Sequence, residues 1–204
     1  MLKKTFQTFT LVFLALLLGA CDSGPKIDRI DQTAVILAFG DSLTHGTGAA
    51  PDQSYPKVLS QKLGRAVINA GVPGETTAQG LKRLPDLLET YAPTLVILCE
   101  GGNDFLRRQD PEQTARNLSA MVDLIKARGA DVILVGVPKL GFGLSVPPFY
   151  AALAEKHAIP FEGEILLELL GDKTMKSDSI HPNAAGYHQM AAAIYEKIMQ
   201  AQRK

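Results

Sequence analysis

The 204-residue chain has no excess charge of either sign and only two cysteines. Its 21 Lys and Arg residues balance 21 Asp and Glu residues, and no basic patch stands out, which argues against a nucleic acid partner. Cys99 ends an apolar run and Cys21 closes a targeting segment, so no disulfide between them is expected. We find no internal repeat and no second domain. With 46% hydrophobic residues, the chain fits one domain with a sizeable core.

Motifs for bound nucleotides and metals are also missing. The sequence contains no Walker loop, no HExxH segment and no Cys-x-x-Cys pair. The stretch Gly46-Thr47-Gly48 lacks the third glycine of a dinucleotide fingerprint, and Pro51 stands where the following helix should continue. We therefore expect no metal and no nucleotide cofactor.

Residues 1–20 are typical of a secretion signal. Lys3 and Lys4 precede an uninterrupted apolar stretch from Leu11 to Ala20, which is short for a membrane span. The stretch ends Leu18-Gly19-Ala20-Cys21, which resembles a bacterial lipobox. That resemblance implies cleavage before Cys21 and lipidation of this residue, with an ordinary secretory signal as the alternative.

Residues 21–32 are polar, contain Gly and Pro, and are predicted to form a tether between the lipid and a domain over residues 33–204. We expect the protein in the bacterial cell envelope, anchored by several acyl chains on Cys21 and facing the periplasm. Asp22 resembles the signal that keeps some lipoproteins at the inner membrane. The choice between inner and outer membrane, and the oligomeric state, stay open.

Strand-like and helix-like segments alternate along the rest of the chain. The predicted strands are Val35–Phe39, Ala66–Asn69, Leu95–Cys99, Val132–Val137 and Ile159–Phe161. The predicted helices are Tyr55–Leu63, Thr77–Tyr91, Pro111–Arg128, Pro148–His157 and Asn183–Gln202. Continuous apolar strands between helices predict an α/β fold with three α/β/α layers, a flavodoxin-like arrangement around a five-stranded parallel sheet.

The first predicted strand runs directly into Gly40-Asp41-Ser42-Leu43. An apolar run that ends in a glycine turn predicts a buried strand, which delivers Ser42 to the sheet edge where ligands bind in open α/β folds. A serine at this edge is a candidate nucleophile. The alternative is that Ser42 only caps the next helix.

Three further loops carry residues suited to acyl transfer. Gly74 follows the second strand and can expose its backbone N–H, and Asn103 follows the third and offers a side-chain N–H for a developing oxyanion. Near the C-terminus, His181 is a candidate base, and Asp178, three residues earlier, can orient its imidazole. Each residue also has a purely structural interpretation as a turn, cap, loop or surface residue.

The chain thus contains Gly-Asp-Ser42-Leu, Val-Pro-Gly74-Glu-Thr, Gly-Gly-Asn103-Asp and Asp178-x-x-His181-Pro-Asn in this order. Their order and spacing resemble the four blocks of the SGNH, or GDSL, hydrolase family, most of all its bacterial type I thioesterase, lysophospholipase and arylesterase group. The resemblance implies Ser42 as nucleophile, His181 as general base and then acid, and Asp178 as its orienting partner. It also implies an oxyanion hole made by the N–H groups of Ser42 and Gly74 and the Asn103 side chain.

A serine esterase is the function that this resemblance implies. It would cleave carboxylic ester, or thioester, bonds of small lipid or aryl esters such as lysophospholipids through an acyl-serine intermediate. The apolar stretch Pro138–Pro148 lies at the same sheet edge, where it either walls an acyl pocket or packs onto the core. The alternatives are an O-acetyl esterase of envelope glycan and a catalytically silent lipoprotein that binds an envelope partner. Acyl-CoA substrates do not suit an envelope location.

Glu100 departs from the family pattern, which usually has an apolar residue before Gly-Gly-Asn. A carboxylate there opposes the negative charge of an oxyanion unless it points away or is paired. Its effect on efficiency and substrate range stays open. His157 and His188 are interpreted as helix-surface residues.

Overall fold

A five-stranded parallel sheet forms the centre of the molecule. The computed structural model describes residues 24–141 and 143–203. The strands follow the order β2-β1-β3-β4-β7, and each neighbouring pair is parallel. They are β1 (Ile36–Gly40), β2 (Val67–Gly71), β3 (Leu95–Cys99), β4 (Asp131–Val135) and β7 (Phe161–Glu162). The predicted five-stranded parallel sheet is confirmed.

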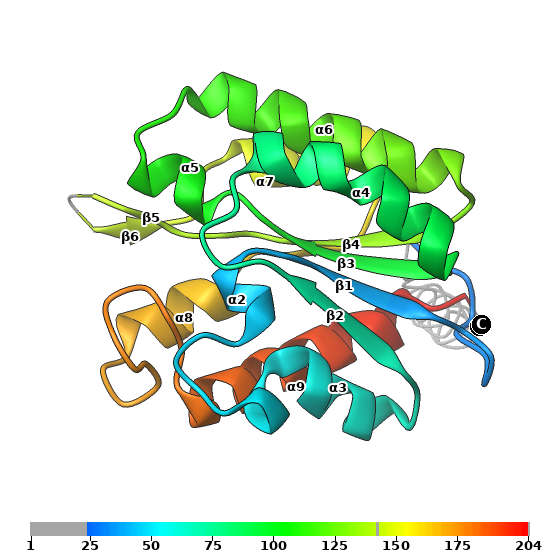
Figure 1. Ribbon diagram of the computed structural model, residues 1–204, viewed down its shortest axis with the longest axis horizontal. Helices are drawn as coiled ribbons and strands as arrows, with labels where there is room; N and C mark the ends of the chain where they lie inside the picture. The colour runs from blue at the N-terminus through cyan, green and yellow to red at the C-terminus, as the bar shows by residue number, and fades with distance from the viewer. Residues whose placement is uncertain (1–23, 142, 204) are drawn as a thin grey trace, which may run out of the picture.

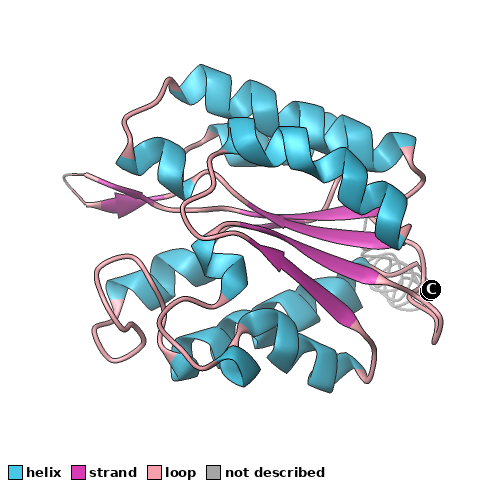
Figure 2. Ribbon diagram, viewed as in Figure 1, coloured by secondary structure: helices cyan, strands magenta, loops and turns pink. Residues whose placement is uncertain are grey.

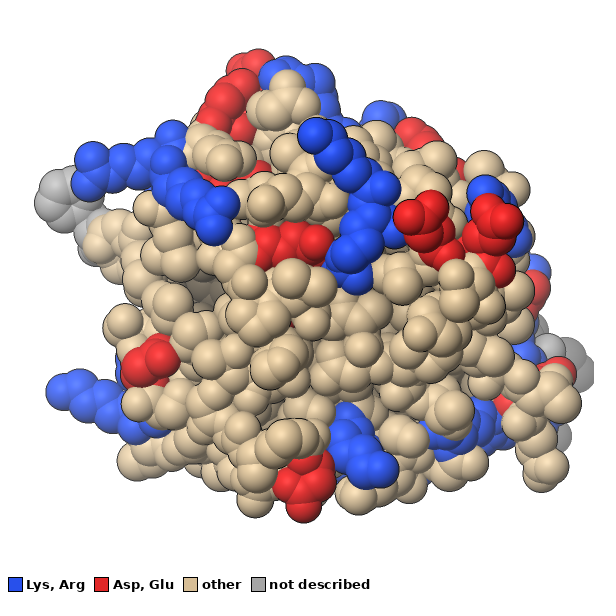
Figure 3. All heavy atoms as spheres, in the orientation of Figure 1, with Lys and Arg blue, Asp and Glu red and all other residues tan. Residues whose placement is uncertain are grey.

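Helices cover both faces of this sheet and complete the three predicted layers (Figures 1 and 2). One layer contains α4 (Thr77–Tyr91), α5 (Gly102–Leu106), α6 (Pro111–Ala127) and α7 (Phe149–His157). The other contains α2 (Ser42–His45), α3 (Tyr55–Leu63), α8 (Ile165–Gly171) and α9 (Ala184–Ala201), and a short 3₁₀ turn, η1 (Pro51–Gln53), precedes α3. Charged side chains of both signs are interspersed over the face shown in Figure 3.

The burial of the strands explains their unbroken apolar sequences. Every residue of β1 and β3 is buried, because helices cover both sides of these central strands. Gly40 lies opposite Gly71 of β2 and Cys99 of β3, so the three strands end at the same edge of the sheet. The segments that follow them, which carry the predicted site residues, therefore start close together.

The long helices begin and end where local signals predict. Asp110 caps α6 by accepting a hydrogen bond from the Glu112 N–H at 3.0 Å, and Pro111 takes the first helical position. The helix ends at Ala127, one residue before the predicted Arg128, and Gly129 follows with φ of 78°. The bounds of α3 and α4 are those predicted from the sequence.

The short elements were not predicted. They are α2, η1, α5, α8 and a hairpin of two antiparallel strands, β5 (Lys139–Leu140) and β6 (Leu144–Ser145). Elements of two to seven residues do not show a hydrophobic period, which is the main signal for secondary structure in a sequence. Four of them, α2, α5, α8 and the hairpin, lie at the end of the sheet where β1 and β3 stop (Figure 1).

Part of the predicted tether is docked on the domain. The Ile27 side chain is 1% exposed, and its backbone pairs with the C-terminal segment at Gln202. Asp28 forms an ion pair with Arg203 at 2.7 Å, and the Asp28 N–H donates to Asp131 at the start of β4. The folded unit therefore includes residues 27–32, which were predicted from the sequence to belong to the tether.

In the part of the chain that the structure describes, no helix is both long enough and apolar enough to cross a membrane. The predicted signal peptide and Cys21 lie outside the described residues.

Candidate active site

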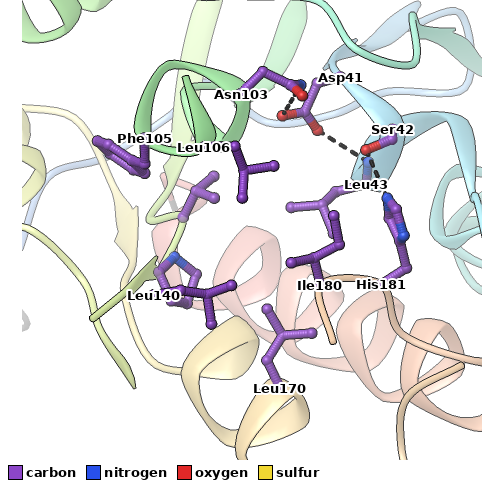
Figure 4. Close-up of a pocket in the computed structure, with 13 residues that line it drawn as sticks. Asp41, Ser42, Leu43, Asn103, Phe105, Leu106, Leu140, Leu170, Ile180 and His181 are labelled. Atoms are coloured by element: carbon purple, nitrogen blue, oxygen red, sulfur yellow. Dashed lines mark hydrogen bonds between the residues drawn. The ribbon is translucent and has the colours of Figure 1, made fainter. Parts of the chain in front are cut away.

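Ser42 is the first residue of α2 and lies directly beyond the end of β1. Asp41 takes the capping position, because its side-chain oxygen accepts a hydrogen bond from the Leu43 N–H at 3.0 Å. The alternative in which Ser42 caps this helix is therefore wrong. The Ser42 Oγ atom instead lies 2.9 Å from Nε2 of His181 (Figure 4).

Two glycines allow α2 to start directly against the sheet. A Cβ atom on Gly40 would lie 2.1 Å from the Cys99 carbonyl oxygen, and one on Gly71 would lie 2.1 Å from the backbone nitrogen of His45. Real Cβ atoms do not approach backbone atoms so closely. The glycine of the Gly-Asp-Ser-Leu block is thus required by packing, and this packing fixes the position of Ser42.

Asp178 holds the ring of His181 within one short loop. Its Oδ2 atom lies 2.7 Å from Nδ1 of His181, and its Oδ1 atom accepts the backbone N–H groups of Ile180 and His181 at 2.8 Å. Burial raises the pKa of Asp178, but these hydrogen bonds outweigh burial and keep the pKa below its usual value. A carboxylate can only accept, so Nδ1 carries the proton and Nε2 is left as an acceptor for the Ser42 hydroxyl.

The loop that carries this pair is itself fixed at both ends. The Ser177 N–H donates to the His181 carbonyl at 3.0 Å, and the Asn183 N–H donates to the Met175 carbonyl at 2.9 Å. The Asn183 side chain then caps α9 by accepting the Gly186 N–H at 3.0 Å. The His-Pro-Asn sequence is therefore a rigid entry into the last helix, which limits the motion of His181.

Asn103 lies in α5 and lines the same cavity as Ser42 and His181. Its Nδ2 atom donates to the Glu75 carbonyl oxygen at 2.9 Å and to Oδ2 of Asp41 at a longer 3.3 Å. Both hydrogens of the amide are thus directed to protein acceptors in this state.

Gly74 lies in the loop between β2 and α4 with φ of 79°, a backbone conformation that favours glycine. Unlike Asn103, it is not among the residues that line the cavity. Within the described part of the chain, no hydrogen bond uses the N–H of Gly74 or of Ser42. The structure therefore leaves two N–H groups near the site without an internal acceptor.

Asp41 is buried behind the nucleophile candidate. Burial raises its pKa to about 6, whereas the Leu43 N–H and the nearby His181 lower it. The neighbouring acids Asp104 and Glu75 raise it further. The charge of Asp41 therefore changes in the mildly acidic range, one residue from Ser42.

An apolar cleft opens beside Ser42 and His181 (Figure 4). The cleft holds about 520 Å³ of empty space when its solvent-open mouth is included. Its apolar lining residues are Leu43, Phe105, Leu106, Val137, Pro138, Leu140, Leu170 and Ile180. The 138–148 stretch was expected either to wall an acyl pocket or to pack onto the core, and different residues do each. Pro138 and Leu140 line the cleft, whereas Val146 packs against the core.

Glu100 is fully buried and does not line the cleft. Its Oε2 atom accepts the Gly101 N–H at 3.1 Å. Burial raises the pKa of Glu100 well above its usual value, and the nearby Asp41 and Glu75 raise it further. The carboxyl group is thus close to the candidate oxyanion donors but separate from the space that a substrate enters.

A second Ser–His–Asp set lies between α6 and α7. Ser119 Oγ is 2.8 Å from Nε2 of His157, and Nδ1 of His157 is 3.5 Å from Asp123. The interpretation of His157 as a surface residue is wrong, since it is buried between the two helices, while His188 is exposed as expected. Ser119 lies in the middle of a helix, and the Lys156 ammonium group donates to its hydroxyl at 3.0 Å. Ser119 does not line the cleft beside Ser42.

The sequence interpretation missed the buried polar residues behind the site. Glu75 pairs with Arg83, and Asp104 accepts the Thr77 N–H at 2.9 Å, which joins α5 to the start of α4. Each acid directly follows a predicted oxyanion residue in the sequence, and this adjacency was the one sequence signal that could have identified it.

The described residues contain no group of three His, Cys, Asp or Glu side chains that could hold a metal ion.

Comparison with known proteins connects this site to ester hydrolases. Residues 38–189 match the model of the GDSL-like lipase/acylhydrolase family. The chain is 33% identical over 199 residues to esterase TesA of Pseudomonas aeruginosa, covering 90% of this chain and 97% of that protein. It is 32% identical over 163 residues to thioesterase 1/protease 1/lysophospholipase L1 of Escherichia coli K12, covering 76% of this chain and 78% of that protein.

A solved structure shows the same architecture. The psychrotrophic esterase EstA from Pseudoalteromonas sp., in a structure inhibited by monoethylphosphonate, aligns with a TM-score of 0.72 and 26% identity. The alignment covers 83% of this chain and 98% of that one. The similarity therefore extends over nearly the whole of the esterase domain.

Proposed function

The chain belongs to the GDSL-like lipase/acylhydrolase family and hydrolyses ester bonds, and on that premise we propose that Ser42 is the nucleophile of the reaction. One observation carries this proposal. The Ser42 Oγ atom, the His181 ring and the Asp178 carboxylate form a continuous chain with separations of 2.9 and 2.7 Å. A nucleophile within hydrogen-bond distance of a base, itself oriented by a third group, is the arrangement that acyl transfer requires.

In the proposed first step, Ser42 Oγ attacks the ester carbonyl while its proton moves to Nε2 of His181. The resulting imidazolium is stabilised by Asp178, whose carboxylate stays ionised because its pKa is low. His181 then gives the proton to the departing alcohol. This leaves an acyl group on Ser42.

The second step repeats the chemistry with water. His181 removes a proton from a water molecule that attacks the acyl-serine carbonyl, and it returns the proton to Ser42 as the acid leaves. Both steps pass through a tetrahedral oxyanion. The rigid loop before α9 keeps His181 in place for both transfers.

We assign the oxyanion hole to the N–H groups of Ser42 and Gly74 and to Nδ2 of Asn103. The first two have no internal acceptor among the described residues, so an oxyanion would satisfy them. Asn103 would exchange its 3.3 Å hydrogen bond to Asp41 for one to the oxyanion. That bond is the longer of its two and is therefore the weaker.

The proposed substrates are lipid or aryl esters such as lysophospholipids. Eight apolar side chains line the cleft beside Ser42, which suits a hydrocarbon or aromatic acyl group better than an acetyl group on a glycan. Hydrolysis of a long-chain lysophospholipid should therefore be faster than release of acetate from O-acetylated glycan. The reverse order would favour the O-acetyl esterase alternative.

We further propose that Cys21 is lipidated and that the domain is held at a membrane of the bacterial envelope, facing the periplasm. The proposal is supported by the lipobox-like sequence before Cys21. Growth with an alkyne-tagged fatty acid should label the wild-type chain but not a Cys21→Ser variant. Equal labelling of both chains would contradict it.

Labelling with a fluorophosphonate probe tests the nucleophile. The probe should modify Ser42, and mass spectrometry of the digested protein should find no adduct on Ser119. Ser119 is a matched internal control, because it also contacts a histidine but lies in the middle of α6 and not on the cleft beside Ser42. Absence of an adduct on Ser42 would favour a silent binding protein.

A further inference from the structure

Glu100 carries a buried oxygen without a donor. Its Oε1 atom is the sole buried side-chain nitrogen or oxygen without a hydrogen-bond partner among the described residues. The Oε2 atom accepts only the Gly101 N–H. A buried carboxylate with a single hydrogen bond is costly, whereas a protonated carboxyl supplies a donor of its own.

Three other acids are buried behind the site, and each is better compensated. Glu75 receives two hydrogen bonds from the Arg83 guanidinium, one of them at 2.8 Å. Asp104 receives the N–H and hydroxyl of Thr77 and the hydroxyl of Thr114. Asp41 receives two N–H groups, from Leu43 and Asn103. Glu100 is therefore the acid whose charge the surroundings stabilise least.

The charged groups that act on the Glu100 carboxyl are Asp41, which lies beyond β1, and Glu75, which lies before α4. Arg83 of α4 is paired with Glu75. Cys99 of β3 and Tyr150 of α7 also lie near Glu100. Arg83 is the nearby cation, and its two hydrogen bonds to a carboxylate both go to Glu75. The Tyr150 hydroxyl donates to the backbone oxygen of Glu100 at 2.7 Å and not to its carboxyl group.

Glu75 is the acceptor available to a protonated Glu100, since the neighbouring Glu75 side chain favours the protonated carboxyl of Glu100 and raises its pKa. The same residue is tied to the proposed oxyanion hole. Its backbone oxygen accepts Nδ2 of Asn103 at 2.9 Å, and Gly74 precedes it in the chain. Whatever fixes Glu75 therefore also fixes two proposed oxyanion donors.

We propose that Glu100 is a positioning residue: its carboxyl group is protonated and donates a hydrogen bond to the Glu75 carboxylate, which holds Gly74 and Asn103 in place. When Glu100 loses this proton, two carboxylates face one another in a buried site and repel. The 74–76 segment then shifts and the oxyanion donors lose alignment, so turnover falls at alkaline pH. This inference rests on the roles proposed above for Gly74 and Asn103.

The pH dependence of kcat in two variants tests the inference. Glu100→Gln keeps an N–H donor that cannot ionise, so it should retain kcat within about 3-fold at pH 7 and lose the alkaline decline of the wild type. Glu100→Leu has no donor, so its kcat should fall about 10-fold with little change in KM, because 1 Å misplacements are costly. Glu162→Gln is the control. Glu162 is a buried acid at the end of β7 that forms an ion pair with Lys197 and accepts the Ile165 N–H at the start of α8. This substitution should leave the alkaline decline of kcat unchanged.

Thermal unfolding provides a second measurement that does not depend on turnover. Because Gln carries no ionisable proton, Glu100→Gln should have a higher Tm than the wild type at pH 9, and the difference should shrink at pH 5. An alkaline decline in Glu100→Gln equal to that of the wild type, or full kcat in Glu100→Leu, would overturn the inference. Fluorophosphonate labelling of Ser42 in each variant separates this result from a failure of the proposed nucleophile.

Discussion

The Nε2 atom of His181 lies 2.9 Å from the hydroxyl oxygen of Ser42, although 139 positions separate the two residues in the chain. One belongs to the first turn after β1 and the other to the last loop before α9. The contact exists because both segments open at the same end of the sheet.

Replacement of Ser42 by alanine should reduce kcat/KM for a short p-nitrophenyl ester by about 10³–10⁶. The side chain is partly buried and is not a cap, so the variant should unfold at nearly the wild-type temperature. Stopped-time assays and thermal unfolding measure the two effects. Near-normal turnover in a folded Ser42→Ala protein would exclude this residue as nucleophile.

Replacement of Asp178 by asparagine should lower kcat by about 10³–10⁴. The asparagine can present an N–H to Nδ1 of His181, which places the ring proton on Nε2, where it can no longer accept the Ser42 proton. Asp172→Asn is a suitable control, since Asp172 makes a similar turn with Thr174 but has no contact with His181. A kcat loss under 10-fold for Asp178→Asn would show that Asp178 only shapes the loop.

Replacement of Asn103 by alanine should lower kcat by about 10²–10³ and change KM little, because one oxyanion donor is lost. The variant also removes the amide that binds the Glu75 carbonyl, so a modest decrease in Tm is expected. Steady-state kinetics over several ester chain lengths gives the comparison. An unchanged kcat would assign Asn103 a structural role only.

Replacement of Leu140 by serine should weaken the preference for long acyl chains. Leu140 lines the cleft but is 47% exposed, so the ratio of octanoyl to acetyl ester kcat/KM should fall by about 5-fold. Leu144 is the matched control, since it pairs with Leu140 in the hairpin but does not line the cleft. The same ratio change in Leu144→Ser would attribute the effect to the hairpin instead of the cleft wall.

The stability of the fold should decrease as pH rises from about 4 to 6. Burial raises the pKa of Asp41 from 3.8 to about 6, so the folded chain holds a proton that the unfolded chain releases in this range. A pKa difference of this size corresponds to about 3 kcal/mol at most. Urea unfolding at several pH values measures it, and Asp41→Asn should make the decline between pH 4 and 6 shallower, with the contribution of Glu100 remaining. The pKa of Asp178 is lowered, so its contribution to the free energy of unfolding is lost as pH falls below about 4. Its side chain is half exposed, so this contribution is smaller than that of Asp41.

The sheet and the long helices were predictable because their hydrophobic patterns extend over many residues. The position of Asn103 beside Ser42 was predicted by the rule that ligands bind where parallel strands end. The pairing of His181 with Ser42 was expected from the family resemblance. The cleft was harder to predict, because Phe105, Leu106 and Leu170 belong to helices too short to show a period.

The partners of the buried polar residues also could not be predicted from the sequence. Nothing in the sequence near Glu75 shows that its partner is Arg83, one turn and a half into α4, or that Glu100 lies beside it. Such partners depend on how elements pack in three dimensions. The one sequence signal was the unusual acid at position 100.

The docking of Ile27 determines how an anchored molecule would face its surroundings. Ile27 and Asp28 join the domain at the C-terminal segment and at the first residue of β4, whereas Ser42 lies beyond the last residue of β1, at the other end of the parallel strands (Figure 1). With a lipid on Cys21, residues 21–26 would span at most about 20 Å between the bilayer and the domain. The cleft beside Ser42 would then open on the side of the domain that faces away from the bilayer. Such an enzyme would hydrolyse esters that reach it through the aqueous compartment and not the lipids of the membrane that anchors it. Detergent-dispersed lysophospholipid should therefore be cleaved faster than the same lipid in the vesicle to which the protein is anchored.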